Sequence, residues 1–364
     1  MRSRSAAKLL RRHHPQRPAP AGGPGIDGGE VKRGVIRLVA FAAVVIILVT
    51  TLPGLGSIRS RLSHGDPAWI AAACGLRLCS ALCYVVLFRS VFDPRMPRRE
   101  AYRLGMAEIG TNAFLPAGGT GGLAVGGWAL HRRGMPTQTV IERSAAFFVF
   151  TSAFNVVAVA AFGWLGLTGV LGGHLRLVLT LAPAIVASAL IMAIVLLTPR
   201  SAALATRQAR YPHHSAAWWV LELLVTLGTG ARGAIGLFRA GNLRAIAAGA
   251  GYLLFDIAVL WAAIHAFRSP GAVVALALAY LIGQLAGEIP VPGGIGVVDG
   301  GLIGALALYG VPIAAASAGA LAYRAISLGV PALFGGFELV ALGREVRHEP
   351  AAVAAASADP EPTR

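Results

Sequence analysis

The sequence predicts an all-α integral membrane protein with about six spanning helices and two Pro-Gly-broken re-entrant hairpins in an inverted repeat. Three observations lead to this fold class. Hydrophobic residues make up 56% of the chain and charged residues only 13%, whereas soluble proteins carry about 25% charged residues. Several apolar stretches approach or exceed the roughly 20 residues that a bilayer-spanning helix needs. Two further apolar stretches are interrupted by runs of proline and glycine.

Basic residues give the predicted helices an orientation. The formal net charge is +16, and the arginines gather at the edges of apolar stretches, as the positive-inside rule describes. A nucleic-acid-binding protein would instead carry a basic face on a soluble module, and the sequence has none. Segment 1–33 is therefore predicted to be a disordered basic cytoplasmic tail, residues 34–343 one polytopic membrane domain, and 344–364 a disordered C-terminal tail.

Six spans are predicted in chain order, and basic residues mark their cytoplasmic ends. The spans are 34–52, 67–92, 139–167, 175–198, 245–267 and 312–342. The second returns to an arginine-rich loop at 95–103, the fourth to a basic loop after Thr198, and the sixth ends before Arg344. Both termini are therefore expected in the cytoplasm. Segment 216–237 is apolar but lies between basic loops, which favours an interfacial or re-entrant helix.

The two broken segments, 102–130 and 271–309, are predicted to enter the membrane and return. The first is interrupted at 115–122 and lies between two basic loops, so both of its ends are expected in the cytoplasm. The second is interrupted at 287–296. Non-helical backbone at membrane depth is tolerated only where protein or a water-filled cavity surrounds it. Charge alone also allows each segment to be a pair of full spans, which would give about ten spans.

The broken segments resemble each other as an internal repeat. When Pro116 is aligned with Pro292, Gly118 meets Gly294, Gly134 meets Gly310 and Pro136 meets Pro312 without a gap. The repeat units are predicted at about 67–167 and 245–342. They are inverted, because the first break enters from the cytoplasm and the second from outside. Paired broken segments of this kind mark substrate sites in transporters. Chance similarity in a chain rich in glycine and alanine, and close helix packing through glycine, are the alternatives.

Polar residues at membrane depth are costly, which makes them candidate functional residues. The candidates for substrate binding are Asn112, Pro116, Gly118, Gly119, Arg143, Glu288, Pro292, Gly293, Gly294, Asp299 and Arg324. The candidates for charge balance or proton coupling are Arg77, Glu108, Glu142 and Asp256. Arginines and the free N–H groups of a broken helix suit a phosphate. The alternative is a set of ion pairs that only hold helices together or, for Glu142 and Arg143, an interfacial position.

The sequence predicts no catalytic site, metal site or cofactor. It lacks a Cys/His metal spacing, a phosphate-binding glycine loop and a serine elbow. Cys74, Cys79 and Cys83 lie in one apolar stretch and are expected to be free packing residues. Asp256 and Asp299 could form an aspartyl protease pair, but no second motif supports that chemistry.

Two motifs carry a resemblance to a known family. The first is Asn112-Ala-Phe-Leu-Pro116, followed by Gly118-Gly119. The second is Pro290-Val-Pro-Gly-Gly294-Ile-Gly296-Val-Val-Asp299, followed by Gly310-Val and then Tyr323-Arg324. Over about 34–343, the chain resembles the transmembrane region of lysylphosphatidylglycerol synthases and its stand-alone, flippase-like relatives.

The chain departs from this family in two respects. Relatives often carry an acid directly after the first Gly-Gly and a basic residue soon after, whereas Leu123 follows Gly121-Gly122 here. Full-length synthases continue into a soluble aminoacyl-transferase domain, for which the chain leaves no room after its membrane part. The resemblance therefore implies a handler of lipids or lipid-linked substrates and argues against lysyl transfer.

The expected function is translocation of a phospholipid or lipid-linked headgroup across the bacterial inner membrane, by a transporter-like protein rather than an enzyme. Membrane lipids are the expected partners, nucleic acid is not, and a separate synthase or glycosyltransferase is one candidate protein partner. Two alternatives stay open: a membrane scaffold or accessory subunit, and a membrane enzyme that acts on lipid-linked sugars. The enzyme is disfavoured because Asp66 is the only acid in the predicted outer loops.

Overall fold

Helices make up all the regular structure in the residues that the computed structural model describes. These residues are 65–114, 126–127, 129–131, 134–169, 176–212, 215–239, 241–269, 271–287 and 297–356. The main helices are α3 (Pro67–Phe92), α4 (Arg98–Phe114), α6 (Thr137–Thr168), α7 (Leu177–Leu197), α8 (Ser201–Gln208), α9 (Ala216–Arg239), α10 (Leu243–Ala266), α11 (Val273–Gly287), α12 (Val297–Leu308) and α13 (Ile313–Ala356). The all-α fold class is therefore confirmed. The predicted tail 1–33 and the predicted span 34–52 lie outside the described residues.

Five described helical segments are long and apolar enough to cross a bilayer. They are Pro67–Phe92, Thr137–Thr168, Leu177–Gln208, Leu243–Ala266 and Ile313–Glu338. They coincide with the second to sixth predicted spans, which confirms a multi-pass membrane protein. Shorter helices stand where the broken hairpins are predicted: α4 precedes the first break, and α11 and α12 flank the second. The breaks themselves, at 115–125 and 288–296, lie outside the described residues.

Two helices extend beyond their predicted boundaries. α7 continues through a 3-10 turn, η1 (Thr198–Arg200), into α8, so Arg200 and Arg207 lie on helical turns rather than in a loop. α13 continues to Ala356, whereas the sequence predicts that the last span ends at Leu342 and that disorder begins after Gly343. Alanine dominates residues 351–356 and has the highest helix propensity, which favours the extension.

The first helix of each repeat begins with the same kind of cap. Asp66 caps α3, where its carboxylate accepts a hydrogen bond from the Ala68 N–H at 2.9 Å. Asn242 caps α10, where its side-chain oxygen accepts one from the Ala245 N–H at 3.2 Å. Short polar side chains of this kind satisfy N–H groups that have no partner within the helix.

The helix boundaries keep the register of the predicted repeat. When the alignment of the two breaks is extended without a gap, Pro67 meets Leu243, and these are the first residues of α3 and α10. Gly134 meets Gly310, and their φ angles are 88° and 90°, a left-handed conformation that favours glycine. Each glycine stands shortly before the long last helix of its repeat, α6 or α13.

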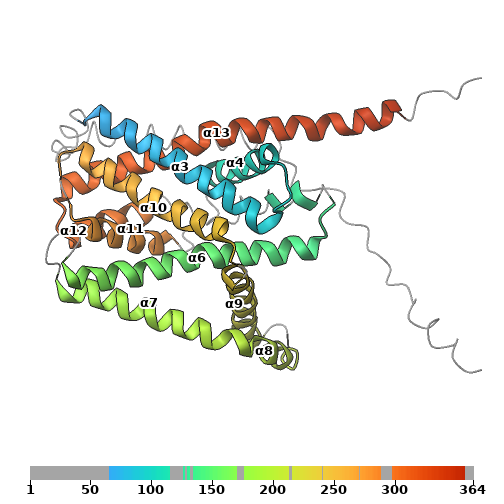
Figure 1. Cartoon of the computed structure of the whole chain (residues 1–364), viewed down its shortest axis with the longest axis horizontal. Coiled ribbons are helices and arrows are strands. Elements are labelled where there is room, and N and C mark those ends of the chain that lie inside the picture. The colour runs from blue at the N-terminus through green and yellow to red at the C-terminus, as the bar shows by residue number, and fades with distance from the viewer. Residues whose placement is uncertain are drawn as a thin grey trace, which may run out of the picture.

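The two repeats run in opposite directions. The Asp66 N–H donates to the Ala266 carbonyl at 2.9 Å, so the start of α3 lies beside the end of α10. The same antiparallel register brings the ring of Trp69 to 5.1 Å from that of Trp261. Figure 1 shows that α6 and α13 also run in opposite directions, and that α4 and the pair α11–α12 lie toward opposite ends of the long helices. This is the inverted arrangement that the sequence predicts.

α7 and α9 lie between the two repeats in the chain and have no counterpart in either. The buried residues of α7 are Thr180, Ala184 and Ala187, while Val178 and Val186 belong to a largely exposed apolar surface. A helix that is apolar on all sides is typical of a membrane span. α9 crosses α6 and α7 at a steep angle (Figure 1). Its interfacial position stays a prediction.

α4 and α13 approach each other to backbone contact. A Cβ atom added to Gly110 would lie 2.6 Å from the carbonyl carbon of Gly335. Small residues allow this approach between membrane helices. The Nε atom of Arg103 and the Oε2 atom of Glu338, 3.3 Å apart, join the same two helices. The first repeat is therefore held closely against the last helix of the second.

Replacement of Gly110 or Gly335 by alanine should force α4 away from α13 and lower the apparent melting temperature in detergent, because overpacking costs about 1–3 kcal/mol. The matched control is Gly329→Ala on α13, where an added Cβ meets nothing within 4 Å. It should leave the melting temperature unchanged or raise it, since alanine is favoured over glycine in helices by about 1 kcal/mol. An equal loss in all three variants would contradict the close approach.

Candidate functional site

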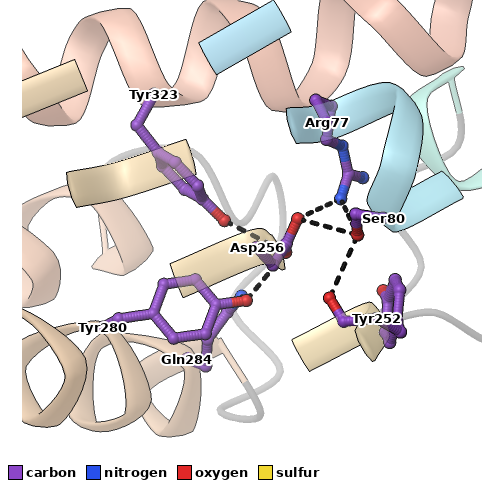
Figure 2. A network of polar contacts seen from close by, with 7 residues as sticks. All are labelled: Arg77, Ser80, Tyr252, Asp256, Tyr280, Gln284 and Tyr323. Carbon is purple, nitrogen blue, oxygen red and sulfur yellow. Dashed lines mark hydrogen bonds and ion pairs between the residues drawn. The ribbon is translucent and has the colours of Figure 1, made fainter. Parts of the chain in front are cut away.

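A buried ion pair lies where α3 and α10 cross. The Nη1 atom of Arg77 pairs with Oδ1 of Asp256, and the two side chains are only 9% and 7% exposed. Arg77 belongs to the first repeat and Asp256 to the second, so the pair joins the two halves (Figure 2). Charges buried to this extent are costly unless they are paired and hydrogen-bonded.

Ser80 connects the ion pair to the backbone of α10. Its hydroxyl lies 3.1 Å from the Tyr252 carbonyl and 3.3 Å from Asp256 Oδ1, and it accepts a hydrogen bond from Arg77 Nη1 at 3.4 Å. Ser80 lies about one turn after Arg77 on α3, and Tyr252 lies about one turn before Asp256 on α10, so each pair shares a helix face. The hydroxyl has one proton and donates to one of its two acceptors at a time.

The second carboxylate oxygen of Asp256 is bound from α11 and α13. The Tyr280 hydroxyl donates to Oδ2 at 2.8 Å, and Gln284 Nε2 donates to the Tyr280 hydroxyl at 2.7 Å. The Tyr323 hydroxyl lies 3.5 Å from the same Oδ2, and its ring meets that of Tyr280 edge to face at 5.9 Å. Asp256 therefore has polar partners from α3, α11 and α13. Together, Arg77, Ser80, Tyr252, Asp256, Tyr280, Gln284 and Tyr323 form the crossing network (Figure 2).

A second acid, Glu108 of α4, has simpler surroundings. Its side chain is 0% exposed, and Oε1 accepts a hydrogen bond from the Tyr84 hydroxyl at 2.7 Å. Among the described residues, Oε2 has no hydrogen-bond partner. Tyr84 lies one turn beyond Ser80 on α3, and its ring meets those of Phe147 and Tyr252 at 5.3 and 5.4 Å. Glu108 is thus a close neighbour of the crossing network, but the described part of the chain places no cation beside it as it does beside Asp256.

A third charged pair lies beside the second break. Asp299 is in the first turn of α12, where a negative charge is favoured by the helix dipole. Its Oδ1 atom lies 3.7 Å from Arg324 Nε of α13, and the side chains are 14% and 23% exposed. That separation is longer than a hydrogen bond, and Arg324 Nε has no hydrogen-bond partner within the described part of the chain. The pair is therefore looser and more accessible than Arg77–Asp256.

The remaining predicted site residues are placed differently. Glu142 is exposed on α6, where it accepts a hydrogen bond from Gln138 at 2.9 Å, and Arg143 beside it is half-buried. Asn112 is half-buried in the last turn of α4. Pro116, Gly118, Gly119, Glu288, Pro292, Gly293 and Gly294 lie outside the described residues. Within the described residues, no group of three or more His, Cys, Asp or Glu could hold a metal ion, and Cys74, Cys79 and Cys83 are free.

Sequence reasoning missed the hydroxyl groups of the site. These are Ser80, Tyr84, Tyr252, Tyr280 and Tyr323. Several carry a local signal, because they lie one helical turn from a polar residue that the sequence does single out, as Ser80 does from Arg77 and Tyr252 from Asp256. A search for hydroxyl side chains at that spacing from each intramembrane charge would have found Ser80 and Tyr252, but not Tyr84, Tyr280 or Tyr323.

Removal of one member of the central ion pair should destabilise the protein strongly. Asp256→Ala leaves Arg77 buried without a counter-ion, which costs about 3–5 kcal/mol, and the apparent melting temperature in detergent should fall sharply. The double variant Arg77→Met with Asp256→Leu removes both charges and should recover most of that loss. Tyr323→Phe, which removes the most distant hydroxyl of the network, is the control for a small effect. A double variant as unstable as Asp256→Ala would argue against the pairing.

Comparison with known proteins places this site within a recognised family. The family model described as "Lysylphosphatidylglycerol synthase TM region" matches residues 35–335 of the 364-residue chain. The match covers the first repeat and most of the second, and it contains the crossing network and the Asp299–Arg324 pair. No curated protein matches the sequence.

Proposed function

Because the chain belongs to the family of the lysylphosphatidylglycerol synthase transmembrane region, we propose that it translocates a phospholipid or lipid-linked headgroup across the membrane. It is a multi-pass membrane protein, and a lipid headgroup is the polar part of the molecule that has to pass through the apolar interior. The protein acts as a transporter rather than an enzyme. Its location is the bacterial inner membrane, with both termini in the cytoplasm.

The antiparallel packing of the two repeats is the observation that carries the proposal. α3 and α10 cross in opposite directions, and the helices that follow them, α4 and the pair α11–α12, lie toward opposite ends of the long helices (Figure 1). Transporters built in this way hold the substrate between the halves, and alternating movement of the halves exposes it to either side. An arrangement of this kind serves a headgroup that has to leave one leaflet and enter the other.

Arg324 is the proposed contact for the phosphate of the headgroup. Its side chain is partly exposed, and its Nε atom lies 3.7 Å from Asp299. That Nε–H group is buried and has no hydrogen-bond partner among the described residues. A guanidinium can bind a phosphate through two parallel hydrogen bonds. Asp299 would hold the arginine in place when no lipid is bound and release it to the phosphate when one arrives.

The crossing network has a different role in this proposal. Arg77 and Asp256 are almost fully buried, and Asp256 already has partners on both oxygens. A lipid phosphate would have to displace these partners to reach Arg77. The network therefore serves as the joint between the halves, and the looser Asp299–Arg324 pair serves as the binding group.

The close pairing of Arg77 with Asp256 supports a second candidate function. A buried ion pair is also what a rigid scaffold needs, because it holds helices in one arrangement. In that case the protein would anchor a separate synthase or glycosyltransferase in the membrane. Stability, and not lipid movement, would then depend on the charged residues.

Lipid movement can be measured directly in liposomes that contain the purified protein and phosphatidylglycerol labelled with a fluorescent headgroup-side probe. Chemical bleaching of the outer leaflet reports how fast the inner-leaflet probe appears outside. Arg324→Ala should lower the flipping rate by about tenfold or more, because a hydrogen bond to a charged group contributes about 1.5–3 kcal/mol. Arg324→Lys keeps the charge but loses the planar guanidinium, so its flipping rate should lie between those of the wild type and Arg324→Ala.

Arg210→Ala is the matched control, because Arg210 is exposed and lies after α8. It should flip the probe at the wild-type rate. Flipping that is unchanged in Arg324→Ala would remove Arg324 from the binding site. A wild-type protein that moves no labelled lipid, but whose charged variants are all unstable, would favour the scaffold.

A further inference from the structure

Two buried acids in this membrane domain have opposite surroundings. Asp256 faces the guanidinium of Arg77 and the hydroxyls of Ser80 and Tyr280. Glu108 is fully buried and receives one hydrogen bond, from Tyr84. A carboxylate beside a guanidinium is stabilised in its charged form, whereas one buried without a cation favours its neutral, protonated form. Acids whose environments differ in this way take different parts in proton chemistry.

We propose that Glu108 is a proton-binding site that couples proton movement to the lipid translocation proposed above. The coupling rests on that proposed function, but the binding of a proton by Glu108 does not. Glu108 accepts a proton when the side of the membrane to which it is open is acidic, and it releases the proton on the other side. Asp256 is paired with Arg77 and takes no part in this exchange.

No ion pair among the described residues includes Glu108. On α3, the facing group is the Tyr84 hydroxyl, and on α10 it is Tyr252, whose ring contacts Tyr84. On α13, Glu338 pairs with Arg103 of α4. α6 contributes the apolar ring of Phe147. Arg77 is paired with Asp256, and Arg324 lies beside Asp299. Neither arginine therefore balances a charge on Glu108.

The unpartnered oxygen of Glu108 faces the segment that follows the first break. A Cβ atom added to Gly126 would lie 2.9 Å from Oε2, so the glycine leaves room for this oxygen. Oε2 accepts hydrogen bonds when the carboxylate is charged and can donate one when it is protonated. Protonation therefore converts Oε2 from a hydrogen-bond acceptor into a possible donor at the position beside Gly126.

The second repeat provides a natural comparison. In the gapless alignment, Glu108 meets Gln284, an amide of almost the same shape that cannot titrate. Gln284 is also hydrogen-bonded to a tyrosine hydroxyl, that of Tyr280, at 2.7 Å. Each of the two side chains therefore bonds to a tyrosine hydroxyl, which donates to Glu108 from α3 and accepts from Gln284 within α11. At this position only the first repeat carries a group that can gain and lose a proton. Glu108→Gln gives the first repeat the chemistry of the second.

Proton binding can be tested without any lipid substrate. Infrared difference spectra of the purified protein in detergent, recorded as the pH is lowered, should show the carbonyl stretch of a buried protonated carboxyl group. Glu108→Gln should lose that band. The control Glu222→Gln changes a half-buried acid of α9 that is hydrogen-bonded to Gln208 of α8, and this variant should keep the band. A band that persists unchanged in Glu108→Gln would overturn the proposal.

Tyr84→Phe provides a second and milder test, which also decides the matter if Glu108→Gln does not fold. The Tyr84 hydroxyl donates to the carboxylate and favours its charged form. Its removal should move the titration of the band to higher pH by about 0.5–1 unit. A titration that does not move in Tyr84→Phe would show that the band comes from another acid, and this too would overturn the proposal.

Coupling is tested in the same liposomes as translocation. The flipping rate of labelled phosphatidylglycerol by the wild type should change when a pH gradient is imposed, and the rate of Glu108→Gln should be the same with and without the gradient. A variant that still responds to the gradient would overturn the coupling. If the wild type flips no lipid, translocation and its coupling both fail, and the infrared band still decides whether Glu108 binds a proton.

Discussion

The arrangement of the two halves depends on the Arg77–Asp256 ion pair. In an apolar interior, neither charge is stable without the other, so α3 and α10 have to cross where these two residues meet. Asp256 then fixes α11 and α13 through Tyr280 and Tyr323. Because α4 packs closely on α13, the first repeat is held at a second place. A single electrostatic requirement therefore sets the register of most of the membrane domain.

Three acids of the same domain differ in the number of partners that surround the carboxylate. Asp256 has a cation and several hydroxyl groups as partners, so both of its carboxylate oxygens are already bound. Asp299 has a cation at 3.7 Å and partial exposure, which suits exchange with an incoming anion. Glu108 has a hydroxyl but no cation among the described residues, which suits exchange of a proton. In the proposed transporter these three properties correspond to a joint, a binding group and a coupling group, and each follows from the number of partners around one carboxylate.

The parts of this structure that depend on neighbouring residues could be predicted from the sequence. α3 covers Pro67–Phe92, as predicted, because its apolar run has clear polar ends. Asp299 and Arg324 are singled out by their place near one break, but their pairing is not predicted. Contacts between distant segments could not be predicted. The partner of Asp256 lies in another repeat, and nothing local identifies it.

α7 gives the second repeat its direction. Between the start of α3 and the start of α10 the chain crosses the membrane on α3, α6 and α7, if the broken segment returns to its own side and α9 lies in the interface. An odd number of crossings turns the second copy upside down, and without α7 the number would be even and the copies would be parallel. The most lipid-exposed helix thus decides the topology through parity alone. A duplication of one ancestral unit becomes an inverted pair when a single additional crossing of almost any apolar sequence separates the copies.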